Sequence, residues 1–252
     1  MSDQKERQAK IQKLAAEWLD REPLFLDTET TGLDGGAQLV ELALIDQLGN
    51  VLIDTLIKPT IPIPAGATEI HGITDQMVKY APAMDTVWAD VRELCRDKLT
   101  IIYNASYDIK LIFQSLQAAG VKGGFIIEGF KTDCAMNAYA EYYGDWNNYH
   151  GNYRWQKLSA AGEHFGIRLD ATLHRARADA ELTRHVVYAM AGQPLPMDNR
   201  GEVVVRGTPK FVRKMHFFLS TETEVFDNEP IERDEHNRTI ERRMRLIIPE
   251  DF

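Results

Sequence analysis

A short apolar run that ends in two acidic residues most strongly constrains what this chain can fold into. The run from Leu24 to Thr28 leads into Glu29 and is closed by Gly32, a pattern typical of a buried strand that stops at a turn. Side chains alternate along a strand, so Asp27 and Glu29 point to one face while Thr28 points to the other. Two converging carboxylates repel each other, and a divalent cation reverses that penalty. The pair predicts a metal site, with a solvent-facing acidic pair as the alternative.

A third acid follows another predicted strand. Residues 100–103 form a short apolar run, and the segment after it has apolar residues at helical spacing. Asp108 therefore lies in the first turn of a helix, at the end of a strand. An acid in that position can bind a metal ion, but a helix N-terminus also favours an acid there through its dipole. The residue alone leaves both interpretations open.

A histidine and a fourth acid occur together in HRARADA. A helix is predicted from about Ala176 to Met190, with Asp179 on its first turn and His174 in the loop just before it. An imidazole in a loop can take a proton from water near neutral pH, as a general base must. The alternative is a solvated loop histidine without a chemical role.

The three fragments together resemble the Exo I, Exo II and Exo III motifs of the DEDDh exonucleases. This DnaQ-like family includes the epsilon subunit of bacterial DNA polymerase III and RNase T, and the resemblance extends over residues 24–192. The matching segments are DTETTGL at 27–33 (Exo I), NASYD at 104–108 (Exo II), HRARAD at 174–179 (Exo III), and EIHGIT at 69–74, which resembles a segment near the terminal nucleotide. Tyr103 and Tyr107 replace a frequent histidine and the usual phenylalanine, and neither change removes a ligand.

The resemblance implies a two-metal 3′-5′ exonuclease. One Mg²⁺ or Mn²⁺ ion would be held by Asp27, Glu29 and Asp179, and a second mainly by Asp27, so that the pair clamps the attacking and leaving oxygens. Asp108 would complete the site directly or through a bound water. His174 would deprotonate the attacking water, and the products would be 5′-mononucleotides. These five residues are the predicted catalytic set, and the four acids are the predicted metal ligands.

The resemblance also implies contacts with the last nucleotides of the substrate. The expected contacts are the backbone amides of Thr28 and Thr30 and the side chain of Leu33, with His71 and Asn104 as further candidates. An apolar residue after a glycine can also pack inward, so a core position is the alternative for Leu33.

Residues 139–155 are dense in aromatic, asparagine and glycine residues. Aromatic faces stack on unpaired bases without sequence preference, at about 1–3 kcal/mol per base. The segment is therefore a candidate single-strand platform. The favoured alternative is an ordered loop whose rings cover an edge of the core. The segment also resembles inserts in phage- and plasmid-type members of the family.

The predicted fold is α/β, a ribonuclease-H-like mixed five-stranded sheet flanked by helices, with a small β-rich C-terminal appendage. Residues 1–21 are expected to form an amphipathic helix that docks on the domain. Residues 22–193 form the expected exonuclease domain. Residues 200–252, which alternate as hairpin strands do, form the appendage, whose role no motif reveals.

Five strands are expected in the main sheet. Three of them, at 24–28, 38–46 and 51–57, form an antiparallel meander. The other two follow later in the chain, at 100–103 and 125–130. Gly49-Asn50 marks a turn within the meander. Glu41, within the apolar run LVELALI, is interpreted as structural and is left out of the predicted site.

The net charge of −9 and the pI near 5.3 do not fit a protein that grips nucleic acid over many phosphates. An enzyme that contacts only the end of a strand can rely on metal ions and a few cations near the motifs. We therefore expect distributive, salt-sensitive action on 3′ ends. Single-stranded DNA is the favoured substrate, RNA trimming is an alternative, and a non-catalytic module that binds strand ends or a polymerase is a third. A polymerase partner and self-association both remain open.

The two cysteines, Cys95 and Cys134, fall in predicted helices, and no CxxC pair occurs. This pattern indicates a reducing, cytoplasmic location without structural disulfides or zinc. No signal peptide is visible at the N-terminus, and no apolar run approaches the length of a membrane span.

Overall fold

The computed structural model describes residues 2–121, 129–167 and 174–196, and beyond them three strands at 202–207, 225–226 and 240–246. The chain forms two compact units, Met1–Leu195 and Pro196–Phe252. The first unit contains all the predicted site residues.

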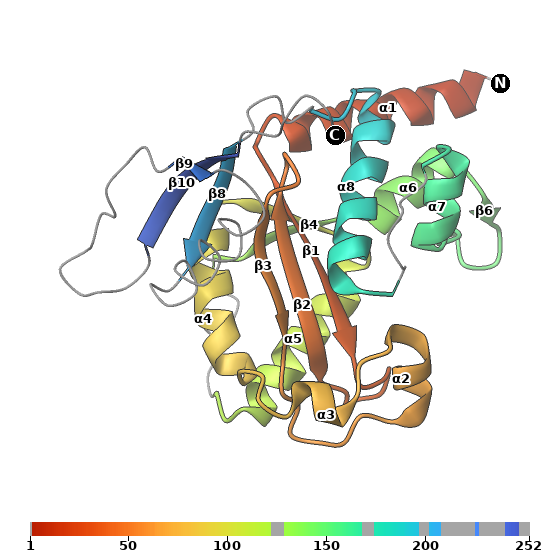
Figure 1. The fold of residues 1–252 in the computed structure, drawn as a ribbon. Coiled ribbons are helices and arrows are strands. Elements are labelled where there is room, and N and C mark those ends of the chain that lie inside the picture. Colours follow the sequence, from red (N-terminus) through yellow and green to blue (C-terminus); the bar gives the residue numbers. More distant parts are fainter. Residues whose placement is uncertain are drawn as a thin grey trace. The chain divides into compact units, whose positions relative to one another are not determined.

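The first unit is built on a mixed five-stranded sheet in the order β3-β2-β1-β4-β5 (Figure 1). Its strands are β1 (Leu24–Thr30), β2 (Leu39–Asp46), β3 (Val51–Leu56), β4 (Leu99–Ile102) and β5 (Lys131–Cys134). The first three form an antiparallel meander, whereas β1, β4 and β5 run parallel. The predicted mixed sheet and its meander are confirmed.

Helices cover both faces of this sheet (Figure 1). They are α1 (Ser2–Leu19), α2 (Ala65–His71), α3 (Asp75–Val78), α4 (Met84–Cys95), α5 (Ala105–Ala118), α6 (Ala135–Tyr143), α7 (Leu158–His164) and α8 (Ala176–Ala191). Alternation along β1 separates two cores: Phe25 packs with α1, α6 and α8, while Leu24 and Leu26 pack with α4 and α5. The strand that carries the first acidic pair is therefore buried between two helical layers.

The N-terminal helix is part of the first unit. Ile11, Ala15 and Trp18 are buried in the same core as α8, and the Trp18 indole Nε1 donates a hydrogen bond of 2.9 Å to Asp133 Oδ2. The expected docking of this helix is confirmed. Among the residues that the structure describes, no helix is both long enough and apolar enough to cross a membrane.

The prediction of a fifth strand at 125–130 is wrong in its position. The strand is Lys131–Cys134, and residues 125–128 lie outside the described ranges. Phe130 instead packs its ring edge-on to Trp88, with centroids 5.3 Å apart. The strand itself has the sequence KTDC, which lacks the apolar run that marks a buried strand. Cys134 consequently ends a strand rather than lying in a helix, whereas Cys95 is the last residue of α4.

The second unit contains a three-stranded antiparallel sheet in the order β8-β10-β9. These strands are β8 (Glu202–Gly207), β9 (Val225–Phe226) and β10 (Ile240–Leu246). The β-rich character of the appendage is confirmed. Residues 210–220 (KFVRKMHFFLS), which share the alternation expected of hairpin strands across 200–252, lie outside the described residues.

Candidate active site

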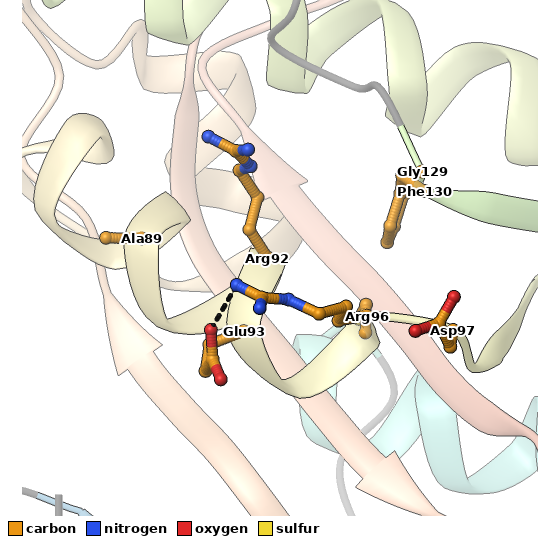
Figure 2. Close-up of a pocket in the computed structure, with 8 residues that line it drawn as sticks. Ala89, Arg92, Glu93, Arg96, Asp97, Gly129 and Phe130 are labelled. Carbon is orange, nitrogen blue, oxygen red and sulfur yellow. Dashed lines mark hydrogen bonds and ion pairs between the residues drawn. The ribbon is translucent and has the colours of Figure 1, made fainter.

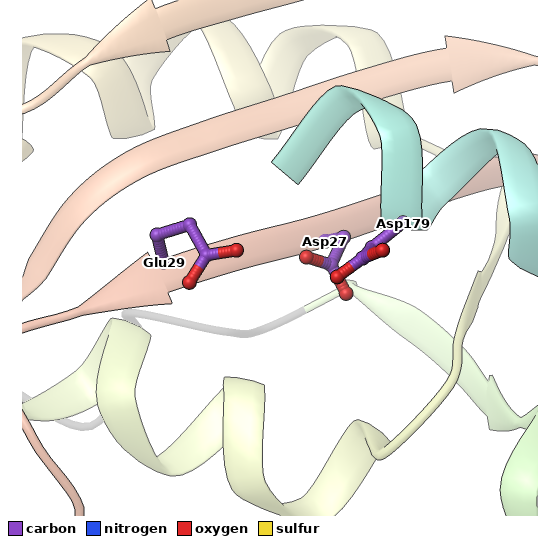
Figure 3. A group of neighbouring side chains, drawn as sticks. All are labelled: Asp27, Glu29 and Asp179. Atoms are coloured by element: carbon purple, nitrogen blue, oxygen red, sulfur yellow. The ribbon is translucent and has the colours of Figure 1, made fainter. Parts of the chain in front are cut away.

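Three of the four predicted acids meet at the junction of β1 and α8. One carboxylate oxygen from each of Asp27, Glu29 and Asp179 lies within 4.8 Å of the other two. Asp27 and Glu29 occupy alternate positions of β1, and Asp179 reaches them from the first turn of α8. Figure 3 shows the carboxyl group of Glu29 turned back along the strand towards the other two acids.

The fourth acid approaches from the other helical layer. Asp108 lies in the first turn of α5, and its Oδ1 accepts a 2.7 Å hydrogen bond from the Thr28 hydroxyl. Thr28 points to the opposite face of β1 from Asp27 and Glu29, so Asp108 is buried beside the three-acid group without belonging to it. The charge of Asp108 nevertheless reaches Asp27 and raises its pKa.

The carboxyl groups oppose one another's ionisation. Burial, and then the charges of Asp108 and Asp179, raise the pKa of Asp27 well above its ordinary value. Burial and the charge of Asp179 raise the pKa of Glu29 to about 8, and burial raises the pKa of Asp108 to about 7. The pKa of Asp179 is also raised, mainly by burial. A bound cation stabilises the ionised form of such carboxyl groups. Their oxygen atoms are the ligands that Mg²⁺ or Mn²⁺ prefers. The residues therefore fit a divalent metal site.

His174 lies beside this group on an exposed part of the chain. Its φ of 66° places the residue in the left-handed region, which a non-glycine residue adopts at a cost. Its backbone N–H donates to the Asp179 carboxylate, so the turn that positions the histidine also orients one acid of the three-acid group. The exposed imidazole can exchange protons with solvent, as the predicted general base must.

Glu41 was interpreted as structural, and the structure places it directly against the site. Its buried carboxylate forms a bidentate ion pair with Arg175 and accepts a 3.0 Å hydrogen bond from the Ala176 backbone N–H. No side chain within α8 caps its N-terminus, so this carboxylate on β2 supplies the cap. Glu41 thereby holds the helix start between His174 and Asp179. A single acid in an otherwise apolar strand was the available signal.

The predicted substrate contacts on the loop after β1 differ in exposure. Leu33 is 79% exposed, which rules out the core alternative for its side chain. Thr28 is buried and its hydroxyl is used by Asp108, while the Thr30 hydroxyl donates to Gly32 O at 2.9 Å. Tyr107, which the sequence marked only as a departure from the family pattern, donates its hydroxyl to the same carbonyl at 2.9 Å. These bonds fix the loop that presents Leu33.

The two remaining substrate candidates have different surroundings. The His71 ring is buried, its Nδ1 accepts from Ile73 N at 3.0 Å, and its Nε2 lies 3.2 Å from Thr30 O. Both ring nitrogens are occupied within the protein, so the geometry gives His71 a positioning role on the end of β1 rather than a direct contact. Burial lowers its pKa. Asn104 precedes α5 with its side chain partly exposed and uncommitted among the described residues.

Figure 2 shows the residues that line a pocket of about 270 Å³. It is lined by the end of α4 and by Gly129 and Phe130, next to the amino ends of β4 and β5. The acids lie towards the carboxyl ends of these parallel strands, so the pocket is at the other edge of the sheet. Its charged side chains are largely exposed, with Arg96 paired to Glu93 at 2.7 Å. We assign it no part in the chemistry.

Comparison with known proteins agrees with this geometry. A family model described as Exonuclease (RNase_T) matches residues 24–187. An uncharacterised exonuclease of Escherichia phage 186 is 42% identical over 189 residues, covering 73% of this chain and 95% of the phage protein. The DNA polymerase III epsilon subunit of Rickettsia felis is 37% identical over 99 residues, covering 37% of this chain and 43% of that subunit.

Solved structures show the same fold at low sequence identity. Escherichia coli exonuclease I in complex with a dA16 oligonucleotide aligns with a TM-score of 0.52 and 19% identity, covering 67% of this chain and 42% of the other. The nuclease domain of 3′hExo, a DEDDh family member bound to rAMP, aligns with a TM-score of 0.52 and 16% identity, covering 67% of this chain and 90% of the other. The chain therefore belongs to the RNase T-like, DnaQ-like exonuclease family with the DEDDh motif pattern, and it is a nuclease with a ribonuclease-H-like fold.

Proposed function

We propose that this protein is a metal-dependent 3′-5′ exonuclease that removes 5′-mononucleotides from single-stranded DNA. The observation that carries the proposal is the convergence of Asp27, Glu29 and Asp179 on one point, with His174 exposed beside it. Relatives named as DNA polymerase III subunits support DNA as the substrate, and the family resemblance supports the 3′-5′ direction.

Each residue of the site has a distinct part in the proposed reaction. Asp27, Glu29 and Asp179 would hold two divalent cations, Mg²⁺ or Mn²⁺, and Asp108 would complete the site directly or through a bound water. When bound, such cations activate a water molecule and stabilise the charge that develops on the leaving 3′ oxygen. His174 accepts the proton of the attacking water on a ring nitrogen and returns it to solvent. The exposed side chain of Leu33 contacts the terminal base.

A time course on 5′-labelled oligonucleotides tests the proposal. A 3′-5′ enzyme shortens the labelled strand one nucleotide at a time, whereas a 5′-3′ enzyme releases the label as a mononucleotide at once. Matched single-stranded DNA, duplex DNA and RNA are compared with Mg²⁺, with Mn²⁺ and with chelator. We expect a descending ladder on single-stranded DNA that requires metal. A protein that shortens none of these substrates in either metal is not the enzyme proposed here.

A substitution separates this activity from contaminating nucleases. Asp27→Asn preserves the shape of the side chain and removes a charge from the centre of the cluster. The variant, purified in the same way, is expected to leave every substrate intact. A ladder that persists at the parent rate with Asp27→Asn would assign the activity to another protein in the preparation.

A further inference from the structure

An aromatic hairpin projects from the first unit between α6 and α7. Two short antiparallel strands, β6 (Trp146–Asn147) and β7 (Asn152–Tyr153), form it (Figure 1). Arg154 N donates to Asp145 O at 2.8 Å across its base, and Gly151 N donates to Asn147 O at 2.8 Å at its tip. Residues 145–156 are called the aromatic hairpin below.

The aromatic rings of this region fall into two groups. Tyr139, which precedes the hairpin in α6, is 1% exposed and belongs to the core. Within the hairpin, the Trp146 ring meets Tyr153 edge-on at 5.0 Å, and Arg7 of α1 lies 5.6 Å from the centre of the Tyr153 ring. These contacts link the two strands of the hairpin to each other and to α1. The alternative that the rings cover the core therefore holds for Tyr139 but not for the hairpin as a whole.

Two rings of the aromatic hairpin are largely exposed, and Trp146 is about half exposed at 48%. Tyr149 is 90% exposed and Trp155 is 68% exposed. Within the described ranges the Trp155 indole takes part in no ring contact or hydrogen bond, and Tyr149 meets only its neighbour His150. Exposed aromatic faces on a hydrogen-bonded hairpin are available to stack on unpaired bases.

The aromatic hairpin is tied to the edge of the sheet that carries the acids. The Tyr103 hydroxyl donates a 3.0 Å hydrogen bond to Gln156 O, directly after Trp155. Tyr103 follows the last residue of β4, and β4 pairs in parallel with β1 up to Leu26, the residue before Asp27. The exposed indole is thus anchored on the side of the sheet where the carboxylates meet.

We propose that Tyr149 and Trp155 stack on unpaired bases of the substrate strand, upstream of the nucleotide held at the carboxylates. This inference rests on the proposed function and adds the means by which the strand is held. A chain with net charge −9 cannot rely on many phosphate contacts, and stacking on bases does not require them. Lys157 is exposed two residues after Trp155 and supplies local positive charge for the strand, whereas the Arg154 guanidinium lies 3.9 Å from the Asp145 carboxylate.

Oligonucleotide binding without turnover is the direct test. In chelator, we compare the affinity of the parent, Trp155→Ala and Tyr149→Ala for labelled single-stranded DNA of 3 and of 12 nucleotides. Each substitution is expected to weaken binding of the longer strand by about 5- to 150-fold and to leave the shorter strand unaffected. Trp155→Phe keeps an aromatic face and should retain most of the affinity. The variant-to-parent ratio should stay constant as salt is raised, because stacking releases no counterions.

Tyr80→Ala is the matched control. Tyr80 is 87% exposed, but it lies two residues before Pro82, whose carbonyl accepts a hydrogen bond from Lys58 N just after β3, the edge strand farthest across the sheet from β4 and β5. Its removal should change neither affinity. Equal binding of both lengths by Trp155→Ala and the parent would overturn the inference. So would conversion of an oligomer to a monomer by Trp155→Ala with unchanged DNA affinity, which would identify the surface as a contact between copies.

Kinetics separate this inference from the proposed function. If the parent digests DNA, Trp155→Ala should raise KM for the longer strand and leave kcat unchanged. If the parent digests nothing while its length-dependent binding still depends on Trp155, the proposed function fails and the hairpin inference stands. If parent and variant both digest DNA with the same KM, the proposed function stands and the hairpin has no part in holding the substrate.

Discussion

Helices α5 and α8 each place an acid next to β1, but different contacts hold the start of each helix. Asp108 and Asp179 are each the fourth residue of a helix, α5 and α8, and each lies near Asp27. At α5 the chain passes from β4 into the helix within two residues, and the acid is buried with a hydrogen bond from Thr28. At α8 the start is held by the Glu41–Arg175 ion pair, and the acid remains partly exposed.

The difference indicates that the two sides of β1 have different roles. The α5 side is fixed by packing and hydrogen bonds, so it would provide a constant part of the proposed metal site. The α8 side carries the exposed histidine, whose backbone is left-handed at a φ of 66° and whose N–H bonds to the Asp179 carboxylate. The residue expected to move a proton is therefore on the side that is open to water. Substitutions on either side test this contrast.

The largest effect is expected from Asp179→Asn. The change keeps the shape of the side chain and removes the only carboxylate that α8 contributes to the three-acid group. Turnover should fall below detection, by more than the roughly 10²–10⁴-fold that loss of a general base costs. Mononucleotide release at saturating Mg²⁺ is the measurement. Activity within tenfold of the parent would show that the cluster is not the metal site.

A smaller loss is expected from His174→Ala. Removal of the imidazole should slow turnover by about 10²–10⁴-fold while metal affinity and substrate affinity stay near those of the parent. Single-turnover rates at several pH values measure the chemical step. The variant should also lose the rise in rate that accompanies deprotonation of the base. A full rate near neutral pH would refute the assignment of the base.

The sequence was sufficient for those parts of the molecule that depend on local periodicity. Alternation in Leu24–Thr30 placed Asp27 and Glu29 on one face, and helical spacing placed Asp108 and Asp179 in first turns. The antiparallel meander followed from three short apolar runs with a turn between the second and third. Each of these features is decided by neighbours within a few residues.

Features that depend on distant partners could not be predicted in this way. Glu41 meets Arg175 across 134 positions of the chain, so an isolated buried acid gave no indication of which element it would cap. The position of β5 depends on its pairing with β4 rather than on an apolar run of its own. The occupied ring nitrogens of His71 likewise follow from the close approach of α2 to Thr30.

Glu41→Gln tests whether the charged cap matters to the site. The amide keeps the size of the side chain but weakens its bonds to Arg175 and to the helix N-terminus. A residue that orients metal ligands typically changes metal affinity or activity by about 10–100-fold, and we expect a loss in this range, partly recovered at high Mg²⁺. Titration of activity against metal concentration is the measurement, and a loss of folded protein without a shift in that titration would contradict the positioning role.

Glu181→Gln is the matched control on the same helix. Glu181 pairs with Arg184 and His185, and although burial opposes its ionisation, the hydrogen bonds from His185 and Arg184 bring its pKa to about 2. The substitution breaks a partly buried ion-pair network that has no contact with the three-acid group. It should lower the melting temperature and leave turnover per folded molecule unchanged. A parallel loss of activity in both variants would mean that any damage to α8 disables the enzyme.

The last expected effect is on the stability of the metal-free protein as the pH changes, and it does not involve turnover. Burial and neighbouring acids raise the pKa of Glu29 from 4.5 to about 8, and burial raises that of Asp108 from 3.8 to about 7. Above about pH 4 the unfolded chain has released these protons while the folded chain keeps them. The free energy of unfolding should therefore fall between about pH 4 and 8, by up to about 1.4 kcal/mol per pH unit for each retained proton, and level off above.

Denaturant unfolding in chelator at pH 5, 6.5 and 8 measures this slope. The same measurement on Asp179→Asn tests whether repulsion between the acids causes it. The substitution removes a charge that raises the pKa of Glu29, so the metal-free variant should be more stable than the parent at pH 8 and should show a shallower slope. Added Mg²⁺ should reverse the order, because only the parent gains the stabilisation that follows from binding the ion to the folded state. If the parent is the more stable protein at pH 8 without metal, mutual repulsion does not dominate the cluster, and the α8 side holds its acid by contacts other than those described.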